Sequence, residues 1–428
     1  MRSIGIICEY NPFHNGHARQ LRLAREAVGE DCALVCLMSG NYVQRGEPAI
    51  FPKALRAEAA LRCGADLVLE LPLTAALSSA EGFAAGGVSI LTALGCDYLC
   101  YGTESDDNNL IMSTAKANLD PAFDALLRAE LATGCSYPAA RQKAIERLGA
   151  GAGLCSPNDI LAVEYCKAIL KQGSPLRPLS VRRTGAYHAE TLDPEAPSAT
   201  ALRASLETAR RGGHWPPAQG TGIQCCHSAR SEESASPIAN ASAWRSAVPA
   251  CLRDLYASAP IHTMGQGERA VLAILRTLPD AAFEALPFGA EGLWSKFMKN
   301  CRSRASVEEI IEATKSKRYT RTRIQRMLLC AFLGLTAADL ERRPPCVRVL
   351  GFNDTGRAAL REMKQRLEAR DPAEPALTLI NAGETPPDQA CYALEVRAAD
   401  LYSLFSADGP RPAGEEASQR VRYLPSAP

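Results

Sequence analysis

The sequence predicts an α/β fold, with a doubly wound parallel sheet over the first two hundred residues or so and a mostly helical C-terminal region after it. Strand-like and helix-like stretches alternate through the first part, which is the pattern of repeated βα units. The strand-like stretches are apolar without alternation, as strands buried on both faces of a parallel sheet require. Beyond residue 244 the apolar residues recur at helical spacing instead.

Local signals place the strands and helices of the first part in alternation. The expected strands are 3–10, 32–40, 66–72, 97–102 and 179–183. The expected helices are 17–28, 52–64, 80–95, 158–170 and 198–212. Pro52 opens the second helix and Gly64 closes it. Ser78 with Glu81 is typical of a capping box for the third helix, and Ser156 is expected to cap the fourth.

Composition divides the chain into four regions. Residues 1–212 are the expected α/β domain, and residues 213–243, rich in Ser, Ala, Pro and Gly, are an expected flexible linker. Residues 244–345 combine helical spacing with many cations and are expected to form a helical domain. Residues 346–428 resemble a small β-α-β unit, and we expect their last dozen residues to be disordered.

The overall composition is that of a folded protein with no acidic or basic bias. The chain has 428 residues, 46% of them hydrophobic, and 48 Lys and Arg against 47 Asp and Glu, so global charge indicates no particular partner. The 16 cysteines include no Cys-x-x-Cys pair, and the chain shows neither a signal segment nor a membrane-spanning apolar run. We therefore expect a cytoplasmic protein with reduced thiols, no metal site and no membrane contact.

Two of the six histidines stand three residues apart in "CEYNPFHNGH", directly after the first expected strand. Ligands of open α/β sheets bind beyond the carboxyl ends of strands, where His14 and His17 fall. Gly16 allows close backbone approach, and the start of the next helix offers N–H groups to phosphate. Two imidazoles can donate hydrogen bonds to phosphate oxygens as charge builds. The alternative is a turn whose histidines only cap the helix; the position after the first strand favours binding of a nucleoside triphosphate.

The His-x-Gly-His arrangement resembles the signature of the nucleotidylyltransferase superfamily. More closely, "GIICEYNPFHNGH" resembles the opening of the bacterial tRNA(Met) cytidine acetate ligase family, and further strings follow in that family's order to about residue 350. They are "MSGNYVQRGEPAIFPKALRAEAAL", "GADLVLELP", "SAEGFAAGGVSIL", "SPNDILAVEY", "SATALR" and "KSKRYTRTRIQR". The resemblance implies a Rossmann-like domain of the nucleotidylyltransferase type. It also implies an enzyme that makes acetyl-adenylate from ATP and acetate and then acetylates the wobble cytidine of elongator tRNA(Met).

Carried over residue by residue, the resemblance assigns ATP binding to one loop and three residues outside it. The loop comprises Ile7, Cys8, Glu9, Tyr10, Asn11, Pro12, Phe13, His14, Asn15, Gly16, His17, Ala18, Arg19 and Gln20. His14 and His17 are the expected catalytic residues, placed on the phosphates. Gly102 would let the nucleotide pass close to the backbone, while Asn158 and Arg183 would bind adenosine or phosphate. We expect ATP to bring magnesium with it as a substrate complex.

"SATALR" resembles the superfamily's second phosphate motif. Ser198 and Thr200 can donate to phosphate oxygens, and Arg203 can neutralise pyrophosphate. The same string would also form an ordinary serine cap of a helix. The motif departs from the synthetase-type "KMSKS" loop because it has no lysine.

Two further polar clusters have two interpretations each. Gln44, Arg45, Glu47 and Lys53 could bind acetate or phosphate beside the pocket, or belong to a solvated loop. The acidic residues Asp97, Glu104, Asp106 and Asp107 stand near Gly102 and could hold magnesium, although ATP commonly supplies its own ion.

"KSKRYTRTRIQR" is the most basic stretch of the chain. Its members are Lys315, Lys317, Arg318, Tyr319, Arg321, Arg323 and Arg326, and further cations precede it. Clustered cations attract a phosphate backbone, and a tyrosine can stack on an unpaired base. The alternative is a solvated basic helix face; the upstream cations and the family resemblance favour tRNA binding.

Two other functions remain open at this level. A small-molecule adenylyltransferase of coenzyme biosynthesis would share the N-terminal domain but would have little use for the basic stretch. A catalytically inactive tRNA-binding protein would bind RNA without releasing pyrophosphate, and the intact histidine motif argues against it.

Overall fold

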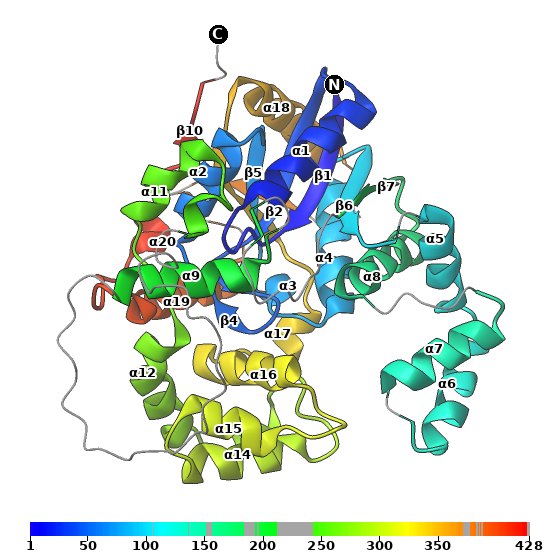
Figure 1. Cartoon of the computed structure of the whole chain (residues 1–428), viewed down its shortest axis with the longest axis vertical. Helices are drawn as coiled ribbons and strands as arrows, with labels where there is room; N and C mark the ends of the chain where they lie inside the picture. The colour runs from blue at the N-terminus through cyan, green and yellow to red at the C-terminus, as the bar shows by residue number, and fades with distance from the viewer. Residues whose placement is uncertain are drawn as a thin grey trace, which may run out of the picture.

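One eight-stranded sheet forms the centre of the molecule (Figure 1). The computed structural model describes residues 1–105, 107–135, 137–150, 156–183, 193–194, 197–211, 243–370, 377–381, 384, 386 and 388–425. The strands are β1 (Arg2–Cys8), β2 (Cys32–Ser39), β5 (Leu67–Leu71), β6 (Tyr98–Thr103), β7 (Arg177–Arg182), β8 (Cys346–Phe352), β9 (Thr378–Ile380) and β10 (Arg422–Tyr423). Their order is β10-β8-β5-β2-β1-β6-β7, with β9 beside β8. A separate hairpin joins β3 (Tyr42–Val43) to β4 (Glu47–Pro48).

The five N-terminal strands of the sheet are parallel, which confirms the predicted doubly wound fold. The chain runs outward from β1 through β2 to β5, then returns to place β6 and β7 on the other side of β1. The strand order therefore reverses between β1 and β6, and a ligand crevice is expected outside their carboxyl ends.

Helices cover both faces of the sheet. On one face lie α4 (Ala80–Ala93), α8 (Pro157–Gln172) and α18 (Asp354–Glu368); on the other lie α1 (Asn15–Val28), α2 (Lys53–Arg62) and α9 (Ala199–Arg211). Strand β2 shows why two layers form, because all its residues are buried and successive side chains point to opposite faces. Val35 and Leu37 belong to the first core, and Leu34 and Met38 to the second.

The cap of α4 differs from the expected one. Ser79, not Ser78, accepts the N–H of Gly82 at 3.2 Å. Ser78 instead donates its hydroxyl to the carbonyl of Thr74 at 2.7 Å, at the end of the short helix α3 (Leu73–Ala76). Glu81 forms an ion pair with Lys167 at 3.2 Å. The preceding helix, which the sequence pattern does not reveal, takes Ser78 out of the capping position.

Four helices account for most of the helical spacing expected over residues 244–345. They are α12 (Met264–Thr277), α14 (Leu293–Ser303), α15 (Val307–Thr314) and α16 (Arg321–Leu333), with the shorter α11 (Arg253–Ala257), α13 (Asp280–Glu284) and α17 (Ala337–Glu341) around them. Helices α12, α13, α14, α15 and α16 share a core of their own, to which the later helix α19 (Gln389–Tyr402) contributes. Figure 1 shows α12, α14, α15 and α16 below the sheet, beyond α9 and β4.

Residues 108–147 form three helices that the sequence analysis does not predict. They are α5 (Asn108–Ala117), α6 (Phe123–Ala132) and α7 (Tyr137–Arg147). Helices α6 and α7 project from one side of the molecule and enclose a small core that includes Phe123, Leu127 and Ala144 (Figure 1). The expected linker, 213–243, lies outside the described residues except for Ala243.

The C-terminal region joins the main sheet. The expected β-α-β unit is formed by β8, α18 and β9, and β8 pairs antiparallel with β5. The tail differs from the expected disorder over residues 417–425, because α20 (Glu415–Ser418) packs on α19 and β10 pairs with β8. Glu416 on α20 is only 1% exposed, and the reason lies in residues far away in the sequence.

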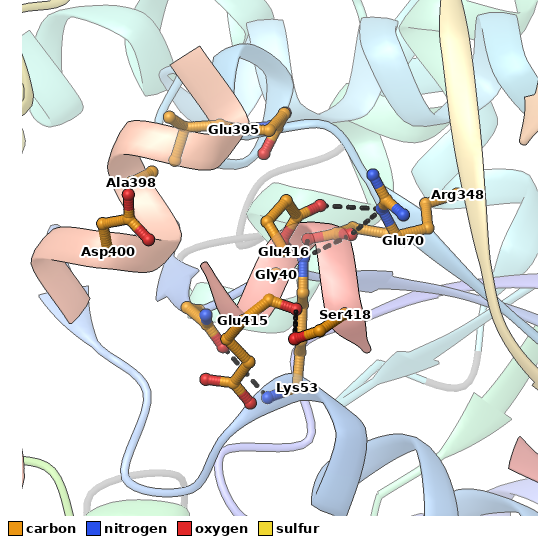
Figure 2. Close-up of polar contacts among 12 residues, drawn as sticks. Gly40, Lys53, Glu70, Arg348, Glu395, Ala398, Asp400, Glu415, Glu416 and Ser418 are labelled. Carbon is orange, nitrogen blue, oxygen red and sulfur yellow. Dashed lines mark hydrogen bonds and ion pairs between the residues drawn. The ribbon is translucent and has the colours of Figure 1, made fainter. Parts of the chain in front are cut away.

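A buried ion cluster holds α20 in place (Figure 2). The Nζ atom of Lys53 lies 2.7 Å from Oε1 of Glu70 and 2.5 Å from Oε2 of Glu416, and Nε of Arg348 lies 2.7 Å from Oε1 of Glu416. All four side chains are at most 5% exposed. Burial lowers the pKa of Lys53, but Glu416 and Glu70 outweigh it and raise that pKa above its usual value.

Glu395 on α19 borders this cluster and makes stability depend on pH. Burial raises its pKa from 4.5 to about 8, and the carboxylates of Glu70 and Glu416 add to the effect. The folded state therefore binds this proton more tightly, so the contribution is present below pH 4.5 and is lost as pH rises through 8. We expect the melting temperature of the parent to fall between about pH 5 and about pH 9, and that of Glu395→Gln to fall less over the same range. Thermal unfolding at a series of pH values measures both. Equal slopes for the two proteins would contradict this assignment.

Candidate active site

A cleft with a volume of about 300 Å³ opens at the carboxyl ends of β1, β6 and β7, at the point where the strand order reverses. Most of the residues proposed from the sequence line it. They are Ile7, Cys8, Glu9, Tyr10, Asn11, His14, Gly16, His17, Arg19, Gln20, Gly102, Asn158, Arg183, Thr200 and Arg203. The sequence pattern and the sheet topology therefore point to the same place.

Five of the proposed residues do not line the cleft: Pro12, Phe13, Asn15, Ala18 and Ser198. Phe13 is fully buried against Tyr10, and the Asn15 amide donates to the carbonyls of Pro194 and Ser246 at 2.9 Å. The Ser198 hydroxyl accepts the N–H of Ala201 at 3.0 Å, so it caps α9. For Ser198 the structure favours the capping interpretation, whereas Thr200 and Arg203 face the cleft.

The two histidine rings stack on each other beside the cleft. Their centroids are 3.7 Å apart and their planes differ by 18°. The N–H of His14 donates to Nδ1 of His17 at 3.3 Å, so Nδ1 is unprotonated and Nε2 of His17 carries the proton. The Nδ1 atom of His14 is buried and makes no hydrogen bond to any described residue. The pair is thus fixed in orientation and still has hydrogen-bonding capacity to offer a ligand.

Both imidazoles are neutral at physiological pH. Burial lowers the pKa of His14 to about 3, with a further contribution from the positive charge of Arg183. Burial, His14 and Arg183 hold the pKa of His17 well below its usual value. Neutral imidazoles can donate N–H groups to a polyanion, but they are weak bases.

The first turn of α1 offers fewer N–H groups than the sequence pattern suggests. The N–H of Asn15 donates to the carbonyl of Ala247 at 3.0 Å, and that of His17 donates to the carbonyl of His14 at 2.9 Å. The N–H of Gly16 has no acceptor among the described residues. A Cβ atom on Gly16 would lie 3.0 Å from the His14 ring, so glycine keeps room for that ring.

Gly102, Asn158 and Arg183 come together in the lining of the cleft. Nη1 of Arg183 donates to Oδ1 of Asn158 at 3.4 Å, and the amide of Asn158 donates to Glu104. The aliphatic part of Arg183 crosses Gly102, where a Cβ atom would lie 3.2 Å from it. Arg182 also lines the cleft. Gly102, Asn158 and Arg183 were proposed from separate segments of the sequence, and in the structure they form one continuous part of the cleft lining.

The β3–β4 hairpin contributes another part of the cleft lining. It carries three of the four polar residues for which the sequence allowed either a place beside the pocket or a solvated loop. Gln44, Arg45 and Glu47 line the cleft. Glu47 lies 3.8 Å from Nη2 of Arg203 and accepts from the Gln325 amide at 3.1 Å. Lys53 is absent from the lining, because it belongs to the buried ion cluster.

Several apolar lining residues were not singled out from the sequence, and Phe83, Leu161 and Tyr165 are examples. They project from α4 and α8, and Leu161 and Tyr165 share a helix face because they are four residues apart. All three lie within strings that resemble the ligase family, which was the signal available for finding them.

The basic stretch proposed for tRNA is partly neutralised within the protein. Arg321 pairs with Glu308 and Glu312, Arg318 with Glu291, and Lys315 with Glu312. Two of its members are turned inward. Arg323 donates to the carbonyl of Phe288, and Arg326 is 9% exposed and donates to the carbonyl of Gln44. Lys317 is exposed and, in the part of the chain that the structure describes, pairs with no carboxylate.

The acidic residues considered for magnesium do not form a ligand set. Asp97 accepts from the N–H of Ser3 at 2.7 Å at the amino end of β6, and Asp107 caps α5. Glu104 accepts from Ser156 and Asn158, and Asp106 lies outside the described residues. Among the described residues no group of three His, Cys, Asp or Glu side chains could hold a metal ion.

Within the described residues, every helix is too short or too polar to cross a membrane. The 13 cysteines there are free thiols.

Comparison with known proteins identifies the family. The model of the HIGH Nucleotidyl Transferase family matches residues 1–416. The tRNA(Met) cytidine acetate ligase of Acetivibrio thermocellus is 32% identical over 98% of this chain and 99% of its own, and that of Clostridium novyi is 36% identical over 86% and 88%. Thermotoga maritima TmcAL, in its apo form, has a TM-score of 0.82 and 29% identity over the whole of both chains; its crystal form with alpha-thio ATP gives 0.80 and 28%. The chain belongs to the HIGH nucleotidyl transferase family and, within it, to the tRNA(Met) cytidine acetate ligases.

Proposed function

We propose that the cleft binds ATP and acetate, and that the protein acetylates the exocyclic N4 amine of the wobble cytidine of elongator tRNA(Met) through acetyl-adenylate. The stacked, neutral His14–His17 pair at the start of α1 is the observation that carries the proposal. It stands at the reversal point of a doubly wound sheet, where such folds bind nucleotides. The binding of alpha-thio ATP by Thermotoga maritima TmcAL, which shares this fold, supports it.

In the first step, an acetate oxygen attacks the α-phosphorus of ATP, and the bond to pyrophosphate breaks. The N–H groups of His14 and His17 donate to the phosphate oxygens on which charge accumulates. Arg183 and Arg203, which both line the cleft, neutralise the triphosphate. Positioning and charge neutralisation suffice here, so no residue has to act as a covalent nucleophile.

In the second step, the cytidine amine attacks the acetyl carbonyl and AMP leaves. A wobble base lies in a single-stranded loop and can enter a pocket without melting a duplex. The second half of the basic stretch is the first part of α16, and α16 contacts the β3–β4 hairpin at the cleft. The contact is close, because a Cβ atom on Gly46 would collide with the backbone of Arg326. RNA bound along this stretch would therefore lie next to the reaction centre.

We also propose that magnesium enters as the ATP complex rather than at a resident site. The four regions inferred from composition keep their proposed roles: ATP binding for 1–212, a linker at 213–243, tRNA binding for 244–345, and the C-terminal α/β region for 346–428.

The decisive experiment uses isotopically labelled acetate, ATP and tRNA(Met), followed by mass spectrometry of the tRNA nucleosides. Labelled N4-acetylcytidine is the expected product, and labelled acetyl-adenylate should form when tRNA is left out. An adenylyltransferase of coenzyme biosynthesis would form neither product. An inactive RNA-binding protein would bind the tRNA but release no pyrophosphate.

Lys317 offers a test of the RNA surface, because it is exposed and without a carboxylate partner among the described residues. We expect Lys317→Ala to weaken tRNA binding and to lower the slope of log K against log salt by about 1, the value for one phosphate contact. Lys171→Ala is the matched control, since this exposed lysine lies at the end of α8 remote from the cleft. Equal salt slopes for both variants, measured by filter binding across a salt series, would count against the proposed surface.

A further inference from the structure

The second step of the proposed reaction needs a proton acceptor. As the cytidine N4–C bond forms and the C–O bond to AMP breaks, the nitrogen must lose one proton. The amine lone pair is delocalised into the base, so removal of that proton during attack would assist the reaction. The two histidines are poorly suited, because burial keeps both imidazoles neutral with lowered pKa values.

Two carboxylates line the described part of the cleft: Glu9 and Glu47. Glu47 lies on the rim with its side chain 34% exposed and is engaged by Arg203 and Gln325. Glu9 follows the end of β1 directly, on the floor of the cleft. Its Oε1 accepts the N–H of Gln44 at 2.6 Å, and it forms no ion pair among the described residues. The hydrogen bond therefore fixes one carboxylate oxygen of Glu9, while no Lys, Arg or His side chain among the described residues forms an ion pair with this carboxylate.

The surroundings of Glu9 raise its proton affinity. Burial raises its pKa, and this is opposed by the N–H of Gln44 and by the more distant charges of Arg45, Arg203 and Arg56. These groups come from the β3–β4 hairpin, α9 and α2, and Tyr165 of α8 also lines the cleft and is close enough for the Glu9 charge to raise its pKa. A carboxylate with a raised pKa accepts a proton more readily than an exposed one.

We propose that Glu9 is the general base of acetyl transfer and takes the N4 proton of the cytidine as the amide bond forms. AMP then departs with the electron pair of the broken C–O bond, and Glu9 later releases its proton to solvent. The inference rests on the proposed function, and it separates the roles within the cleft: the histidines serve the phosphates, and Glu9 serves the amine.

The test is Glu9→Gln, which keeps an oxygen able to accept the Gln44 N–H but removes the base. Acetyl-adenylate formation is measured by acetate-dependent exchange of pyrophosphate into ATP, and transfer is measured in a single turnover with preformed acetyl-adenylate and tRNA. We expect transfer to fall about 100-fold or more while exchange falls only a few-fold, the usual range for loss of a general base. The parent transfer rate should rise with pH through the pKa of Glu9, and the variant should lack this rise. Glu9→Asp should restore part of the transfer rate.

The outcomes are distinguishable from failure of the proposed function itself. If the parent protein forms no acetyl-adenylate, the proposed function fails before Glu9 is tested. If the parent is active and Glu9→Gln transfers acetyl at the parent rate with the parent pH profile, the inference is overturned. Equal losses in exchange and transfer would overturn it as well, because Glu9 would then serve ATP binding alone. A melting temperature close to the parent value shows that the variant is folded.

Discussion

His17→Ala is expected to slow acetyl-adenylate formation by about 100-fold or more, the cost of removing one fixed hydrogen-bond donor to a developing anion. His14→Ala should cost about as much, because its ring stacks on His17 at 3.7 Å and stands against the same cleft. Both changes should act chiefly on the rate constant rather than on binding of ATP, since the donors are needed most when charge builds up. Acetate-dependent exchange of pyrophosphate, measured over a range of ATP concentrations, gives both quantities.

His262 provides the matched control for the histidine variants. It is also buried and stacked, with its ring 4.2 Å from that of Tyr402, and burial lowers its pKa to about 4. It does not line the cleft. His262→Ala should therefore lower thermal stability yet leave the exchange rate of the folded protein near the parent value. Normal exchange in His14→Ala and His17→Ala would show that the pair only caps α1.

Lys53→Met is expected to destabilise the fold by about 3–5 kcal/mol, the cost of leaving buried charges uncompensated. The methionine keeps much of the apolar stem but leaves Glu70 and Glu416 facing each other with Arg348 as the remaining cation. Chemical denaturation at neutral pH measures the free energy of unfolding. Because the cluster fastens α20 to the sheet, proteolysis at the C-terminus should also accelerate.

Arg22→Met is the control for the loss of an ion pair as such. Arg22 pairs with Glu26 at 2.6 Å across one turn of α1, and both side chains are about half exposed. Exposed pairs of this kind contribute only about 0.3–0.5 kcal/mol. If the two variants lose similar free energies of unfolding, the buried cluster is not the fastening that its geometry indicates.

Local sequence patterns predicted most of the α/β part because its elements are set by nearby residues. Strand β2 is an unbroken apolar run, and Ser156 caps α8 by accepting the N–H of Asp159. The histidine loop could be placed for a related reason, since the carboxyl end of the first strand is a defined position in a doubly wound sheet. Gly102, Asn158 and Arg183 required the family resemblance, because nothing local marks them as neighbours.

Other features could not be predicted because partners distant in the sequence decide them. Glu416 lies 363 positions from Lys53, and no pattern in the tail indicates that its carboxylate is buried. Lys53 looked like a pocket residue because it follows the β3–β4 hairpin, yet α2 turns it into the cluster. Arg326 belongs to a basic stretch by composition, but the α16 helix places it against Gln44.

By itself, the sequence determined the parallel α/β architecture, the family and the loop that presents His14 and His17, because hydrophobic periodicity, turn residues and a contiguous motif are local properties. Only the tertiary structure decided which polar and charged side chains face the cleft and which form contacts inside the protein. Thr200 and Glu9 line the cleft, whereas Ser198 caps a helix and Lys53 belongs to the buried ion cluster. The physical reason is that desolvation and ion pairing depend on distances between segments that meet only when the chain is folded.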